Sequence, residues 1–113
     1  MSTYMLSASS IIGNDVKSVS GDDVGDIKDI MMNPETGEAT YAVVSFGGFL
    51  GFGDKYFAVP FSALKLDRED ESYRLNQTKE RLEDAPGFDK DNWPDFADPQ
   101  FRNTITNYYA RAA

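Results

Sequence analysis

Short apolar segments separated by turn signals run through residues 11–76, and this alternation constrains the fold more than any other feature. Residues 39–46 and 56–59 are rich in β-branched and aromatic side chains, whereas glycine, proline, asparagine and aspartate gather between the apolar segments. Strands favour the first group of residues and turns favour the second. Several short strands at this spacing are typical of a small all-β barrel or sandwich. We therefore expect a mainly β domain.

The details of these segments predict a small antiparallel β-barrel of about six strands. Residues 39–46 are mostly apolar on both faces, as in a central strand that is covered on two sides. Pro60 cannot donate a hydrogen bond to a neighbouring strand, so residues 60–63 are expected to form a short helical turn or corner. The segments that flank the acidic turn 67–72 alternate apolar and cationic residues, which indicates a half-exposed hairpin.

The sequence changes character after Asn76, within a chain of 113 residues that has the size of one domain. We expect the β-barrel to occupy residues 1–76 and a C-terminal helical extension to occupy residues 77–113. A tail stays disordered unless side chains anchor it, and Trp93 and Phe96 are expected to be such anchors in preference to ligand contacts. The extension should pack on the barrel or on a second subunit.

Two helices are expected in the extension. Residues 78–84 favour a short helix before a proline-glycine pair. Asp98 is a typical helix cap and proline follows it, so a final helix is expected over about residues 99–110. Helical periodicity places three apolar side chains on one face of it: Phe101, Ile105 and Tyr108. This face either packs inside the protein or is offered to another chain, and the sequence leaves both open.

A glycine-rich segment over residues 47–53 separates two expected strands and carries Phe49, Leu50 and Phe52. Its glycines do not follow the order of a dinucleotide-binding or phosphate-binding loop. They suit a wide turn whose backbone adopts positive φ angles. The three apolar side chains either fold back over the open end of the barrel or form a docking surface for another protein.

The acidic character of the chain excludes several partners. Nineteen acidic and eleven basic residues give a net charge of −8, which repels phosphate backbones, so we expect no nucleic-acid binding. The apolar runs are far shorter than the roughly 20 residues that cross a bilayer, so no direct membrane insertion is expected. The N-terminal residues do not resemble a secretory signal, which favours a cytoplasmic location.

The supply of reactive side chains argues against an enzyme. The sequence has no cysteine and no histidine, which excludes a structural zinc site and catalysis that rests on imidazole or thiol. The acids gather in turns and tails, where solvated charge is the ordinary explanation. In particular, Asp22, Asp23, Asp26 and Asp29 do not have the spacing of a calcium-binding loop. We expect a non-enzymatic protein without a metal or cofactor.

Taken together, these segments closely resemble the PRC-barrel family over roughly residues 9–76. The resemblance is carried by residues 16–17, 21–25, 27–30, 36–37, 41–44, 47–53 and 57–61. The tail, with its tryptophan-proline pair and its two final tyrosines, is similar to that of bacterial stand-alone members. The resemblance implies a PRC-type β-barrel without a shared active site. Such a barrel forms part of the bacterial photosynthetic reaction centre and of the ribosome-maturation factor, and in both it docks onto other proteins.

The function expected from these observations is that of a protein-protein interaction module. A barrel of this size supplies only about 3–5 kcal/mol by itself, so buried surface from the tail or from a second subunit is needed, and we expect a homodimer. Two alternatives stay open: an accessory module of membrane-associated or photosynthetic electron-transfer complexes, and a small-molecule or ion-binding stress protein. The expected partner-binding residues are Phe49, Leu50, Phe52, Trp93, Phe96, Phe101, Ile105 and Tyr108.

Overall fold

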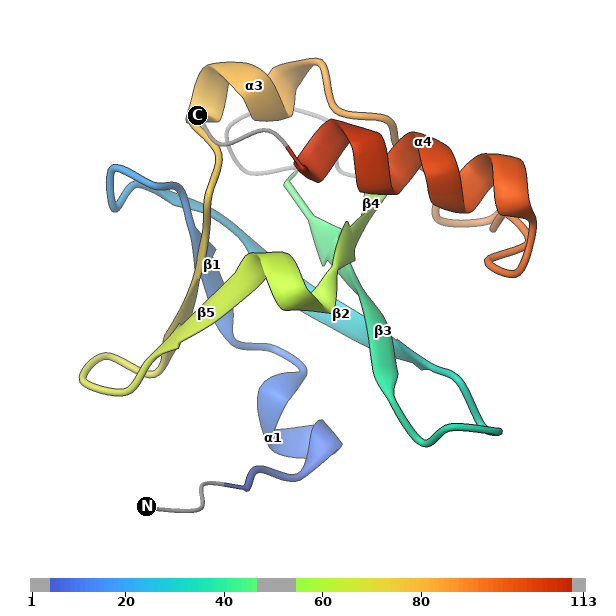
Figure 1. Ribbon diagram of the computed structural model, residues 1–113. Helices are drawn as coiled ribbons and strands as arrows, with labels where there is room; N and C mark the ends of the chain where they lie inside the picture. The colour runs from blue at the N-terminus through green and yellow to red at the C-terminus, as the bar shows by residue number, and fades with distance from the viewer. Residues whose placement is uncertain (1–4, 47–54, 111–113) are drawn as a thin grey trace.

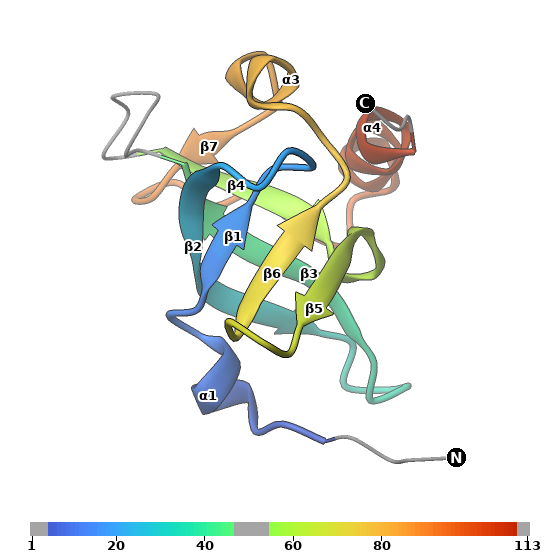
Figure 2. The same ribbon diagram turned by 90° about the vertical axis from the view of Figure 1, so that its left-hand side faces the viewer.

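A strongly curved, seven-stranded mixed sheet forms the body of the protein, with the two C-terminal helices at one end and a short N-terminal helix at the other (Figures 1 and 2). The computed structural model describes residues 5–46 and 55–110. In chain order the elements are α1 (Ala8–Ile11), β1 (Asp15–Lys17), β2 (Asp23–Met32), β3 (Ala39–Ser45), β4 (Lys55–Pro60), η1 (Phe61–Ala63), β5 (Leu64–Asp67), β6 (Ser72–Leu75), α3 (Lys79–Glu83), β7 (Phe88–Asp89) and α4 (Pro99–Tyr109).

The strand order is β5-β6-β1-β2-β3-β4-β7, which confirms a mainly β fold with a C-terminal helix. One detail differs from the expected antiparallel barrel, because β1 and β6 pair in parallel through Val16 and Tyr73. The β5–β6 hairpin returns from far along the chain to lie beside the first strand (Figure 2), so its direction is not set by a short turn. The order ends at β5 and β7, and no pairing between these two strands closes the sheet within the described residues.

Local sequence signals account for most of the connections. Pro60 ends β4, and the η1 turn follows it as predicted, leading into the β5–β6 hairpin around the acidic turn. Helix α4 begins as predicted, since the side chain of Asp98 accepts a hydrogen bond from the Gln100 backbone. The short helix α1 was not predicted, because its four residues carry no apolar periodicity, although Ser7 caps it.

The core lies inside the curved sheet and is completed by the two C-terminal helices. Phe46 and Phe57 are buried at its centre with ring centroids 4.9 Å apart. Leu82 of α3 and Ile105 of α4 are buried in the same cluster. The strand β7 also comes from the C-terminal segment and pairs with β4. The C-terminal segment therefore packs on the sheet of its own chain.

An arginine joins the two C-terminal helices. The Nε atom of Arg81 donates to Oε1 of Gln77 at 2.9 Å, and its Nη2 atom donates to the Tyr108 carbonyl at 2.7 Å. Its guanidinium lies over the Tyr108 ring, 4.2 Å from the centroid, which is a cation-π contact. The Tyr108 hydroxyl in turn donates to the Arg81 carbonyl. These contacts fix the end of α4 against α3.

Replacing Tyr109 with phenylalanine is expected to make the protein as stable as the wild type or about 1 kcal/mol more stable at pH 7. Its side chain is 4% exposed, and its hydroxyl has no hydrogen-bond partner among the described residues.

Burial raises the pKa of the Tyr109 hydroxyl far above its usual value. The folded state therefore resists ionisation, and stability should fall as the pH rises above about 10, where the unfolded tyrosine ionises. Tyr109→Phe should reduce this alkaline loss, as measured by urea unfolding between pH 7 and 11.

The matched control is Tyr108→Phe, which removes the hydroxyl that donates to the Arg81 carbonyl. This change should cost about 1 kcal/mol at pH 7, because a hydrogen bond between the helices is lost. A larger loss of stability for Tyr109→Phe than for Tyr108→Phe would contradict the assignment of the unpaired hydroxyl.

The length and the apolar character of a helix decide whether it can span a membrane. In residues 5–46 and 55–110, no helix combines the length and the apolar character that a membrane-spanning helix needs.

Candidate functional site

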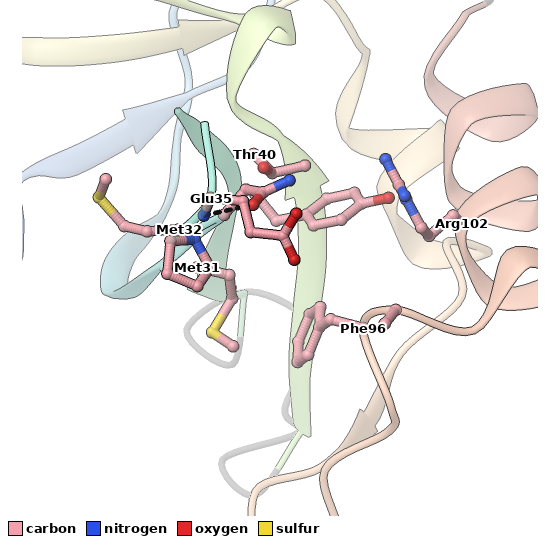
Figure 3. A pocket seen from close by; sticks show the side chains of 10 residues that line it. Met31, Met32, Glu35, Thr40, Phe96 and Arg102 are labelled. Carbon is pink, nitrogen blue, oxygen red and sulfur yellow. Dashed lines mark hydrogen bonds between the residues drawn. The ribbon is translucent and has the colours of Figure 1, made fainter. Parts of the chain in front are cut away.

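A groove of about 330 Å³ opens between the β2–β3 hairpin and the beginning of α4 (Figure 3). We call it the hairpin-helix groove. Its apolar walls are formed by Met31, Met32, Pro34, Tyr41 and Phe96. Glu35 on the hairpin and Arg102 on α4 also line it, so that each side contributes one charge.

Both methionines reach the groove because the end of β2 is irregular. Successive side chains of a regular strand point to opposite faces of the sheet. The pairing register of β2 with β3 shifts between Met31 and Met32, and a shift of this kind re-aims a side chain. Both methionines therefore line the groove, where Met31 extends toward Phe96 and Met32 extends away from it (Figure 3), and Met32 is 52% exposed. The side chain of Asn33 stabilises the turn that follows, because its Oδ1 atom accepts a hydrogen bond from the backbone N–H of Glu35 at 2.9 Å.

An aromatic cluster supports the groove from the other side. Phe96 is its centre, with centroid distances of 5.4 Å to Phe101, 5.8 Å to Tyr41, 5.9 Å to Phe88 and 6.1 Å to Trp93. Most of these rings meet edge to face, which is a favourable arrangement for aromatic pairs. The cluster thus holds the segment before α4 against β3, β4 and β7, and it gives the groove a firm floor of Tyr41 and Phe96.

The charged groups at the groove are free of ion pairs within the described part of the chain. Lys17 forms a salt bridge with Asp70 at 2.7 Å, and Lys28 forms one with Asp26 at 3.0 Å. Neither involves Glu35 or Arg102. Figure 3 shows these two side chains reaching the groove from opposite sides, one from the hairpin and one from helix α4. The groove therefore offers an anion and a cation beside an apolar surface.

The predicted site residues fall into three groups. Trp93, Phe96 and Phe101 come together in the aromatic cluster, and Trp93 remains 38% exposed. Ile105 is buried in the core with 1% exposure, and Tyr108 is partly buried against Arg81. The remaining three lie outside the described residues: Phe49, Leu50 and Phe52.

Sequence reasoning missed the methionines and the charges of the groove. Met31 and Met32 stand immediately before the predicted turn, so their place at a hairpin end was readable from the sequence. The place of Arg102 at the same groove as Glu35 was not, because the two residues lie on distant parts of the chain and line one groove only through the docking of α4.

The aspartates that were considered for calcium binding lie on and beside β2. Among the residues that the structure describes, no three acidic side chains gather in a way that would hold a metal ion. The groove instead presents thioether and aromatic side chains together with one acidic and one basic side chain.

A comparison of the sequence with models of known protein families identifies the family of the domain that contains the sheet. The family model of the PRC-barrel domain matches residues 5–82. The chain belongs to the PRC-barrel family. This family is generally non-catalytic. A search of the curated proteins finds no match. The PRC-barrel match ends within α3, so the hairpin side of the groove lies inside the matched region, whereas Phe96 and Arg102 lie beyond it.

Proposed function

We propose that this PRC-barrel protein is a non-catalytic protein-binding module and that the hairpin-helix groove is its binding surface. The observation that carries the proposal is the composition of the groove, which joins exposed methionine, aromatic rings and an arginine that forms no ion pair within the described residues. Methionine, aromatic residues and arginine are enriched where proteins bind one another. Methionine in particular adapts its shape to different apolar partners.

The exposure of the surrounding side chains favours a protein over a small molecule. Sites for small molecules usually enclose most of the surface of their ligand. Here Met32 is 52% exposed and Trp93 is 38% exposed, so the apolar surface extends onto the outside of the molecule. A partner that covers this surface has to be larger than the groove, which suits another folded chain.

Site-specific cross-linking tests this function. A photoreactive benzophenone amino acid at position 32 samples the groove, and the same residue at position 65 samples an exposed place on β5 that does not line the groove. In cells that produce the protein, we expect discrete protein adducts from position 32 and none from position 65. Replacing Ala97, an exposed residue of the groove wall, with glutamine should reduce the adducts about tenfold by filling the groove.

The adducts themselves do not carry the conclusion, since reactive groups also trap chance neighbours. The dependence on position and on Ala97→Gln carries it. Equal adducts from positions 32 and 65, or adducts that Ala97→Gln leaves unchanged, would show that the groove is not the binding surface.

A further inference from the structure

The charges beside the hairpin-helix groove point to its occupant. This inference rests on the proposed function and names the partner. We propose that the groove binds a second copy of this chain, with two copies packed groove to groove about a two-fold axis, so that Glu35 of each lies opposite Arg102 of the other.

The first argument is the local balance of charge. The whole chain carries a net charge of −8, which makes two copies repel each other over most of their surface. At the groove this excess is absent, because Glu35 and Arg102 are the charged side chains that line it. Apolar contact between two copies at the groove therefore brings together no excess of acidic lining residues.

The second argument is symmetry. In a two-fold dimer the same surface serves both copies, so that a residue of one copy meets a different residue of the other and the reverse contact follows automatically. Such a surface has to be complementary to itself. Glu35 and Arg102 meet this requirement, since they reach the groove from opposite sides and neither is neutralised by an ion pair within the described residues (Figure 3).

The third argument concerns the apolar part of the surface. Met32 is 52% exposed, and its flexible side chain is suited to enter the groove of a facing copy. The floor of the groove, formed by Tyr41 and Phe96, is held in place by the aromatic cluster. Each copy thus presents an adaptable apolar side chain and a firm apolar floor, which is the combination that a self-complementary contact needs.

Charge reversal tests this arrangement by sedimentation over a range of concentrations. We expect the wild type to form dimers, and Glu35→Arg and Arg102→Glu each to weaken dimerisation on the order of 100-fold, because each variant brings like charges together twice. The decisive sample is an equal mixture of the two variants. Each contact is then again between a cation and an anion, so the mixture should form mixed dimers of wild-type strength, and so should the double variant.

Matched controls separate this effect from net charge and from damage to the fold. Glu38→Arg makes the same change of charge on the same hairpin, and Lys65→Glu makes the opposite change on β5, and neither residue lines the groove. Both should dimerise like the wild type. Glu35→Arg lowers the net negative charge, so weaker dimerisation in this variant cannot come from general repulsion. All four residues are exposed, and each variant should keep the thermal unfolding curve that a monomer of the wild type shows at low concentration.

Three outcomes would overturn the inference: a monomeric wild type at high micromolar concentration, dimers that both charge reversals leave intact, or a mixture of the variants that stays monomeric. In each case the cross-linking at position 32 still decides the proposed function. Groove-dependent adducts to a different protein would then preserve protein binding while excluding the second copy as its partner.

Discussion

Replacing Gly25 with alanine is expected to destabilise the protein by about 3 kcal/mol or more, which is enough to unfold much of the population of a small domain. Gly25 lies on β2 where it crosses the end of β3. A Cβ atom on this residue would overlap the carbonyl oxygen of Ser45 and lie 3.0 Å from the Phe46 ring. The backbone oxygen cannot move aside without breaking the pairing of the two strands, and the Phe46 side chain is fully buried.

The measurement is urea unfolding followed by circular dichroism, with Gly37→Asn as the matched control. Gly37 lies in the β2–β3 turn at a φ of 80°, and an added Cβ there would meet nothing within 4 Å. Asparagine tolerates this backbone conformation, so the control should lose no more than about 1 kcal/mol. If Gly25→Ala is as stable as Gly37→Asn, the close approach of β2 to β3 is not a constraint on the fold.

Replacing Ile105 with aspartate should cost about 3–5 kcal/mol, since it places an unpaired charge in the core or forces α4 off the sheet. Ile105 is 1% exposed and belongs to the same buried cluster as Leu82. The control is Thr104→Asp, which adds the same charge to the neighbouring residue on the exposed side of the helix. We expect the control to stay within about 0.5 kcal/mol of the wild type.

Urea unfolding measures both variants, and limited proteolysis reports whether α4 has detached. Ile105→Asp should be cleaved rapidly within α4 and Thr104→Asp should resist. Equal stability and equal resistance would mean that this face of α4 does not pack in the core of its own chain. In that event the alternative raised by the sequence, a helix face offered to another chain, would be favoured.

The elements that the sequence predicted are those with local signals. Pro60 marks the corner after β4, and Asp98 marks the beginning of α4, and in both cases the chemistry of one or two residues decides the outcome. The apolar stripe of the final helix was also recognised. Whether Ile105 packs within the chain was left open, because periodicity shows that a face is apolar but not which surface covers it.

The features that escaped prediction depend on contacts between distant parts of the chain. The parallel pairing of β1 with β6 arises from the return of a late hairpin, which no local pattern records. The groove was missed for the same reason, since its hairpin side and its helix side meet only in three dimensions. The register shift at Met31 also has no signature in residue type, because methionine is compatible with either face of a strand.

The division of the groove between the hairpin and the far end of the chain has a consequence for biosynthesis. The β2–β3 hairpin leaves the ribosome before Phe96 and Arg102 do, because it precedes both residues in the chain. A nascent chain that ends before Phe96 therefore has the hairpin side of the groove but lacks the helix side. The groove is complete only when α4 has been synthesised and packed, so a contact that needs both of its sides cannot form before then.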